Sequence, residues 1–166
     1  MSKTPKEVRK ISQRTYGPPK ADLDEVNLRL LSELQHDPRL SISKLARRVG
    51  MSSPAVTERI QRLESAGVIS GYRMDVDPKA LGLPVTAFAR VRPAPGQVPR
   101  CMEVASEIPQ VVECYRITGE DCLLVKLHAE SIEALEELLD LFLRYGQTST
   151  SIVVSSPVPQ RPLPLT

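Results

Sequence analysis

The segment Ser41–Gly67, SISKLARRVGMSSPAVTERIQRLESAG, decides the fold of the first half of the chain. Ser41 and Ser52 each precede a stretch with helical periodicity, and serine is a favoured N-cap residue. Only Gly50 and Met51 separate the two stretches, so the spacing predicts two helices joined by a tight turn. The apolar residues expected to face inward recur at helical spacing: Ile42, Leu45, Ala46, Val49, Val56, Ile60 and Leu63.

The flanking segments extend this pattern to a whole domain. A further helix is predicted from Leu23 until His36-Asp37-Pro38 ends it, because proline disfavours helical geometry in the residue before it. After Gly67, the mixed segment Val68–Val76 is interpreted as a short hairpin, the wing. Residues 22–76 therefore have the element order of a winged helix-turn-helix DNA-binding domain, although helical hairpins that do not bind DNA share parts of this pattern.

Charge supports a polyanionic partner for this half only. Residues 1–80 carry 15 Lys and Arg against 10 Asp and Glu, whereas 81–166 carry 7 against 10. Much of the excess lies in residues 1–21, which are either a solvated flexible arm or a basic arm that reaches DNA phosphates.

The second half predicts a different domain, α+β in class, after a linker at 77–84. Strands are expected at 85–91, 111–117, 122–127 and 148–155, with helices at 98–108 and from Ser131 to a Gly146 stop. This β-α-β-β-α-β order over 85–156 is ferredoxin-like and leaves one sheet face uncovered. Since 123–127 and 152–154 are apolar on both faces, we expect a second copy to cover it, giving a homodimer. The proline-rich residues 157–166 are expected to form an extended tail.

Other function classes find little support in the composition. No stretch approaches the roughly 18 apolar residues of a membrane span, and the first residues lack a signal peptide, so a cytoplasmic protein is expected. Cys101, Cys114 and Cys122 show no metal-ligand spacing, and no nucleophile, paired carboxylates or histidine cluster suggests catalysis. An enzyme or metal protein on a ferredoxin-like fold is the rival class; we expect no catalytic residues, metal or cofactor.

The residues 23–72 (LDEVNLRLLSELQHDPRLSISKLARRVGMSSPAVTERIQRLESAGVISGY), 112–139 (VECYRITGEDCLLVKLHAESIEALEELL) and 148–156 (TSTSIVVSS) closely resemble the Lrp/AsnC, or feast/famine, family of regulators. The resemblance implies a bacterial or archaeal regulator that dimerises through its sheets, assembles further into octamers, and binds amino acids or related metabolites between dimers. The family's turn usually reads Gly-x-x-Asp, whereas this chain has Gly119-Glu120-Asp121-Cys122. The position of the aspartate is therefore occupied by Cys122, with an acid one place earlier at Asp121.

Candidate DNA-binding residues follow from the helical wheel of the second helix of the pair. Its outward positions would meet base edges, flanking arginines suit phosphates or guanine, and arginines of the preceding helix and wing suit phosphates. Each is otherwise an ordinary solvated residue. The set is Arg47, Arg48, Ser52, Ser53, Pro54, Thr57, Glu58, Arg59, Gln61, Arg62 and Arg73.

Candidate effector-binding residues lie where the resemblance points, at the turn after the second strand and in the last strand. An amino acid needs hydroxyl or backbone groups for its carboxylate and an acid for its ammonium. The alternative is a solvated turn beside good strand formers. The set is Tyr115, Gly119, Glu120, Asp121, Cys122, Thr148, Ser149 and Thr150. The predicted function is thus a sequence-specific DNA-binding regulator modulated by an amino acid or related metabolite; an effector-independent architectural DNA-binding protein is the alternative.

Overall fold

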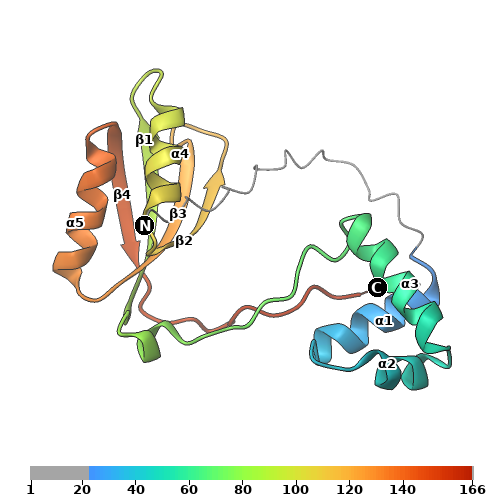
Figure 1. The fold of residues 1–166 in the computed structure, drawn as a ribbon. Coiled ribbons are helices and arrows are strands. Elements are labelled where there is room, and N and C mark those ends of the chain that lie inside the picture. Colours follow the sequence, from blue (N-terminus) through green and yellow to red (C-terminus); the bar gives the residue numbers. More distant parts are fainter. Residues whose placement is uncertain (1–22, 166) are drawn as a thin grey trace, which may run out of the picture. The chain divides into compact units, whose positions relative to one another are not determined.

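A computed structural model of the chain describes residues 23–165 (Figure 1). The basic arm expected at 1–21 lies outside them. The described chain forms two compact units, one reaching to Arg73 and including the residues from Pro162 onward, the other spanning Met74–Arg161. Each unit has a hydrophobic core of its own.

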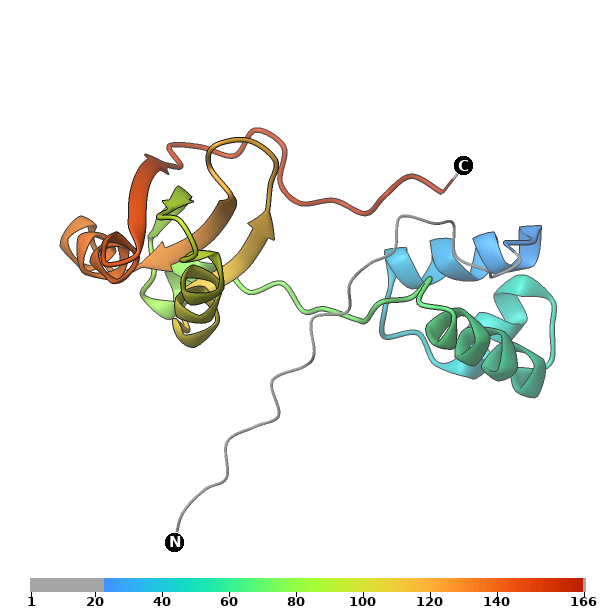
Figure 2. The same cartoon turned by 90° about the horizontal axis from the view of Figure 1, so that it is seen from above.

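The first unit contains three helices: α1 (Glu25–His36), α2 (Ile42–Val49) and α3 (Ser53–Ser65) (Figure 2). The predicted caps are confirmed, because Ser41 accepts a hydrogen bond from Lys44 N and Ser52 from Ala55 N. Gly50 ends α2 with φ of 69°, a left-handed conformation that favours glycine. The helices bury a shared core of Leu30, Leu34, Leu45, Ala46, Val49, Val56 and Ile60.

The predicted wing is wrong. Residues 68–76 contain no strand, and every residue from Ser70 to Asp77 is exposed. Val68 and Ile69 instead donate their amides to Leu63 O at 2.9 and 3.2 Å, which caps the end of α3 after the left-handed Gly67. A two-stranded hairpin is marginal without a surface to pack on, and no buried side chain of this segment supplies one.

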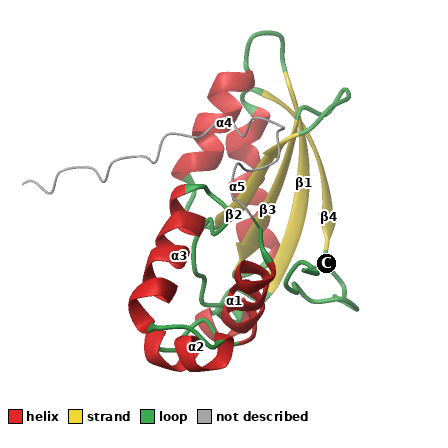
Figure 3. Cartoon of the chain, turned by 90° about the vertical axis from the view of Figure 1, so that its right-hand side faces the viewer, coloured by secondary structure: helices red, strands yellow, loops and turns green. Residues whose placement is uncertain are grey.

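The second unit is an antiparallel sheet with two helices. After a 3-10 turn at Pro78–Leu81 within the expected linker, it contains β1 (Val85–Pro93), α4 (Val98–Glu107), β2 (Val111–Arg116), β3 (Leu123–Ala129), α5 (Ile132–Leu143) and β4 (Gly146–Ile152). The strand order is β2-β3-β1-β4, with all neighbours antiparallel. The ferredoxin-like prediction is confirmed, and α4 and α5 cover the same sheet face (Figure 3).

Strand alternation separates the covered face from the open one. Ala87, Ala89 and Val91 of β1, together with alternate residues of β3, are buried beneath the helices. On the open face β3 presents Leu124, Lys126 and His128, all half-buried. The prediction that β3 is apolar on both faces is therefore wrong, because its open face is mixed.

Gly146 does not end α5 as expected; it begins β4 opposite Pro93. A Cβ added at Gly146 would lie 2.3 Å from Arg92 O and 2.8 Å from Pro93 Cα. The glycine is thus required by the close approach of β4 to β1. On α5, Leu135 and Phe142 are buried, whereas Ile132 is 43% exposed.

Candidate DNA-binding helix and effector turn

The outward side of α3 carries four of the predicted DNA-binding residues. Pro54, Glu58, Gln61 and Arg62 are all exposed, while Val56, Ile60 and Leu63 are buried on the opposite side. The four lie at i, i+4, i+7 and i+8, which places them along one stripe of a helix. Glu58 and Arg62 form an ion pair within this stripe.

The N-terminal residues of α3 use their polar groups within the helix. Ser52 accepts a hydrogen bond from Ala55 N at 3.4 Å, and Thr57 Oγ1 donates to Ser53 O at 3.0 Å. Ser53 and Thr57 are half-buried, whereas Ser52 is exposed. The Ser52 hydroxyl therefore caps the start of the helix, and the Thr57 hydroxyl is bonded to the helix's own backbone.

Arg59 does not share the outward stripe. Its Nη1 donates to Asp24 Oδ2 at 2.6 Å and to Asn27 Oδ1 at 3.0 Å, both at the start of α1. The side chain of Arg59 is 29% exposed, against 74% for Arg62. Asp24 is also the N-cap of α1, and the hydrogen bond from Asn27 N, followed by the one from Arg59, lowers the pKa of its carboxyl group.

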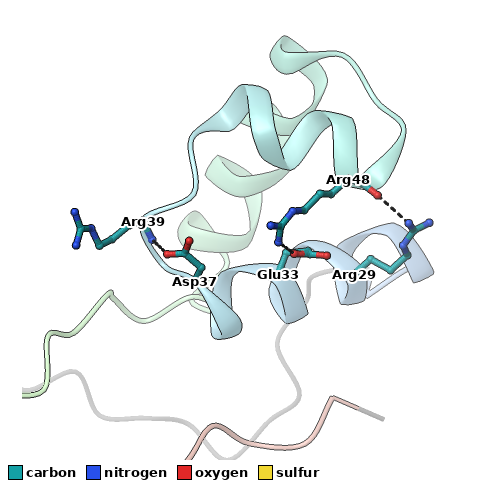
Figure 4. A network of polar contacts seen from close by, with 5 residues as sticks. All are labelled: Arg29, Glu33, Asp37, Arg39 and Arg48. Carbon is teal, nitrogen blue, oxygen red and sulfur yellow. Dashed lines mark hydrogen bonds and ion pairs between the residues drawn. The ribbon is translucent and has the colours of Figure 1, made fainter.

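The arginines of α2 lie exposed at its last turn. Arg48 pairs with Glu33 of α1, and Arg29 Nη2 donates to Arg48 O at 2.9 Å (Figure 4). The backbone amide of Arg39 donates to Asp37 Oδ1 at 2.9 Å while its side chain points away from that carboxylate. These contacts join α1 to α2 near the surface, and such exposed ion pairs add little stability.

Arg47 is exposed in the same last turn of α2, and Arg73 is exposed in the extended segment that follows α3. The loss of the predicted hairpin removes the wing as the element that would position Arg73. Tyr72, its neighbour, donates a hydrogen bond to Glu64 Oε1 at 3.2 Å, and partial burial followed by this hydrogen bond raises its pKa.

The predicted effector turn is held by an arginine that the sequence did not single out. Arg92, at the end of β1, places Nη2 2.7 Å from Glu120 Oε2 and Nε 3.4 Å from Asp121 Oδ1. The turn is closed by a hydrogen bond of 2.9 Å from Ile117 N to Cys122 O. Both acids of the turn therefore already have a cationic partner, and Cys122 Sγ lies 3.8 Å from Glu120 O.

The register divides the remaining effector candidates between the two sheet faces. Ser149 lies opposite Arg90 and Tyr115 opposite Leu124, so both share the open face with Arg92. Thr148 and Thr150 lie opposite Val91 and Ala89 and so belong to the helix-covered face. The structure thus brings Glu120 and Asp121 together on Arg92 but does not bring Thr148 and Thr150 to that side. Gly119 lies in the same turn.

The open face holds three polar contacts of its own. Lys126 Nζ lies 3.1 Å from Glu113 Oε1, and Thr86 Oγ1 is 3.0 Å from His128 Nδ1. Burial, with Lys126 nearby, lowers the pKa of His128. Tyr115 donates to Glu113 Oε2 at 2.8 Å, so this face combines paired polar groups with apolar ones.

Both halves of the chain match known family models. Residues 23–64 match the AsnC-type helix-turn-helix domain, and residues 86–163 match the Lrp/AsnC ligand binding domain. The transcriptional regulator LrpC of Bacillus subtilis is 38% identical over 133 residues, which is 80% of this chain and 92% of LrpC. The chain belongs to the Lrp/AsnC family of transcriptional regulators.

Solved structures of Lrp/AsnC proteins share the fold. The structure of B. subtilis LrpC has a TM-score of 0.79 and 36% identity, covering 84% of this chain and 100% of that one. The feast or famine regulatory protein of Mycobacterium tuberculosis complexed with L-methionine has a TM-score of 0.75 and 33% identity, with 85% and 100% covered. A Neisseria meningitidis regulator in complex with L-Met has a TM-score of 0.77 and 27% identity, with 87% and 97% covered.

Two further properties of the described residues concern other classes of protein. Within 23–165 none of the helices has the length and apolarity of a membrane span. In the same part of the chain, no three His, Cys, Asp or Glu side chains gather closely enough to hold a metal ion.

Sequence reasoning missed three residues of these Lrp/AsnC sites: Asp24, Asn27 and Arg92. Asp24 carried a signal, since an Asp directly before a helical pattern is a favoured N-cap. Asn27 and Arg92 carried none, because their partners lie far away in sequence or depend on the turn's conformation.

Proposed function

We propose that this regulator binds double-stranded DNA in a sequence-specific manner through α3 and that an amino acid or related metabolite changes this binding. The observation that carries the DNA-binding part is the exposed stripe of Pro54, Glu58, Gln61 and Arg62 on the second helix of a matched helix-turn-helix. In this motif the second helix lies in the major groove and its outward side chains meet base edges.

The contacts divide by chemistry. Gln61 and Arg62 have the amide and guanidinium groups that pair with adenine and guanine edges. Within residues 23–165 Arg62 is held only by the exposed pair with Glu58, which is worth at most about 1 kcal/mol and yields readily to DNA. Arg47, Arg48 and Arg73 supply phosphate contacts that add affinity without sequence preference.

An amino-acid effector at the turn 117–122 is the second part of the proposal. The M. tuberculosis and N. meningitidis relatives were solved with L-methionine, which supports this class of ligand. The zwitterion of an amino acid complements the charges here: its ammonium group would bind Asp121, and its carboxylate would bind Arg92. Cys122 cannot supply the charge of the family's aspartate, so Asp121 takes that role.

The assembly and location belong to the same proposal. The open sheet face carries Phe88 and Leu124, each half-buried in a single chain, and a second copy would remove them from water. We therefore expect a homodimer through this face and further association of dimers up to an octamer. A chromosomal regulator is expected to act in the cytoplasm.

The test starts from DNA selected out of a random duplex library by the wild-type protein. Gln61→Ala and Arg62→Ala should each weaken binding to the selected duplex by about 1–3 kcal/mol and relax its sequence preference. Arg144→Ala, an exposed arginine at the end of α5, is the matched control and should leave affinity unchanged. If selection enriches no sequence, the protein is the architectural DNA-binding alternative.

The effector is tested on the same duplex. Calorimetry with the twenty amino acids should find at least one binder that also shifts DNA affinity, because the two equilibria are linked. Asp121→Asn should abolish that binding and leave ligand-free DNA affinity intact. A binder that leaves DNA affinity unchanged is not the effector, and no binder at all would refute an amino acid as the signal.

A further inference from the structure

We propose that Arg59 is a positioning residue, which fixes the recognition helix α3 against the start of α1 and makes no contact with DNA. The inference rests on the proposed function, because it explains how α3 is held for DNA binding. It removes an arginine from the predicted DNA-binding set and assigns two residues of α1, Asp24 and Asn27, to the same task.

The geometry of the Arg59 side chain carries the first step. One guanidinium nitrogen reaches Asp24 Oδ2 at 2.6 Å and Asn27 Oδ1 at 3.0 Å, across 35 and 32 residues of sequence. On α3 itself, Arg59 lies beside buried Val56 and Leu63, at i−3 and i+4. Its aliphatic stem therefore follows the edge of the apolar face while its charged end points to α1.

The receiving groups are themselves fixed. Asp24 is the N-cap of α1, and its Oδ1 accepts a hydrogen bond from Asn27 N at 2.7 Å. Asn27 is the buried polar side chain of the described residues, 8% exposed. The Asp24 carboxylate thus caps the N-terminus of α1 with one oxygen and binds Arg59 of α3 with the other. This couples the cap of α1 to the orientation of α3.

Arg62, in contrast, is an arginine of α3 that is available to contact DNA. It lies three residues further on, is 74% exposed, and in the described part of the chain pairs only with Glu58 of its own helix. A phosphate can take Arg62 at the cost of a weak surface pair. Taking Arg59 would break its hydrogen bonds to both Asp24 and the buried side chain of Asn27, which is costlier.

The decisive experiment uses the sign of an effect. Asp24→Ser keeps a capping residue, as at Ser41 and Ser52, but removes the carboxylate. If Arg59 contacted DNA, this change would release it and remove a nearby negative charge, so affinity for the selected duplex would rise. If Arg59 positions α3, affinity should fall by about 2- to 30-fold, the range for residues that act on a ligand without touching it. Glu25→Gln, an exposed acid in the first turn of α1, controls for charge and should not weaken binding.

Two further variants give independent outcomes in the full-length protein, with circular dichroism confirming that each is folded. Arg59→Lys keeps a charge that serves a phosphate equally well but cannot form the same planar contacts, so it should weaken binding while the salt dependence stays unchanged. The double variant Asp24→Ser/Arg59→Ala should bind no more weakly than Arg59→Ala.

The inference is overturned if Asp24→Ser tightens binding or leaves it unchanged, or if Arg59→Ala reduces the slope of log affinity against log salt by about 0.9, the value of one lost phosphate contact. Those outcomes leave the proposed function standing. A wild-type protein that selects no duplex would instead refute the proposed function, and the inference with it.

Discussion

The substitution Gly146→Ala tests the packing of β4 against β1. The added Cβ would lie 2.3 Å from Arg92 O, 2.8 Å from Pro93 Cα and 3.0 Å from Arg92 C, all of them backbone atoms. Ordinary contact needs about 3.4 Å or more, so the strands must separate by about 1 Å at this end. Overpacking of this kind costs typically 1–3 kcal/mol, and because backbone cannot swing aside as a side chain can, we expect about 3 kcal/mol.

Strand propensity makes the opposite prediction, which gives the test its power. Alanine in a strand interior is better than glycine by about 0.5–1 kcal/mol, so without the close approach Gly146→Ala would stabilise the protein. The free energy of unfolding is measured by urea titration followed by far-ultraviolet circular dichroism. Gln147→Ala, an exposed neighbour on the same strand, should change it by less than about 0.5 kcal/mol. A Gly146→Ala protein as stable as wild type would refute the argument from close approach.

Two other substitutions address the cores and the cap. Phe142→Ala removes a fully buried side chain of α5 and should cost about 3–5 kcal/mol in the unfolding of the second unit, followed by the same titration. The difference in free energy of unfolding between wild type and Asp24→Ser should depend on pH, because the pKa of Asp24 is lowered in the folded protein. The Asp24 carboxylate contributes its full stabilisation above the unfolded pKa of about 3.9, and this stabilisation is lost as pH falls through the folded pKa. Urea titrations from pH 6 to pH 2.5 should show the two proteins converging at the acidic end, and a difference that stays constant would show that the carboxylate does not carry the effect.

Features set by neighbouring residues were predictable from the sequence. The serine caps at Ser41 and Ser52, the left-handed Gly50 and the apolar periodicity of α2 and α3 all follow from interactions within a few residues. The ferredoxin-like fold of the second unit followed from the alternation of elements, because a β-α-β-β-α-β sequence has few unknotted arrangements.

The sequence-based predictions were wrong where the conformation of a segment depends on its tertiary contacts. The residues 68–76 have a hairpin-like composition, but no described surface stabilises a hairpin there. A glycine after a helical pattern, such as Gly146, is typical of a helix end. Here the glycine is required by the close approach of the β1 backbone, more than fifty residues earlier. The alternation of Leu124, Lys126 and His128 is present in the sequence, but which alternate set faces away from the helices depends on packing that only the structure shows.

The candidate DNA-binding site shows the same limit within one helix. Arg59 and Arg62 are three residues apart, and composition treats them alike. Arg62 pairs with Glu58 one helical turn earlier, and this spacing can be read from the sequence. Arg59 pairs with Asp24, 35 residues earlier, and this contact depends on how α1 crosses α3. The helical wheel held a partial signal, since Arg59 borders the apolar face through Val56 and Leu63. Without Arg59, the predicted DNA-binding residues on the outward side of α3 are Pro54, Glu58, Gln61 and Arg62. This stripe is narrow enough for a helix in the major groove to present all four side chains to one run of bases.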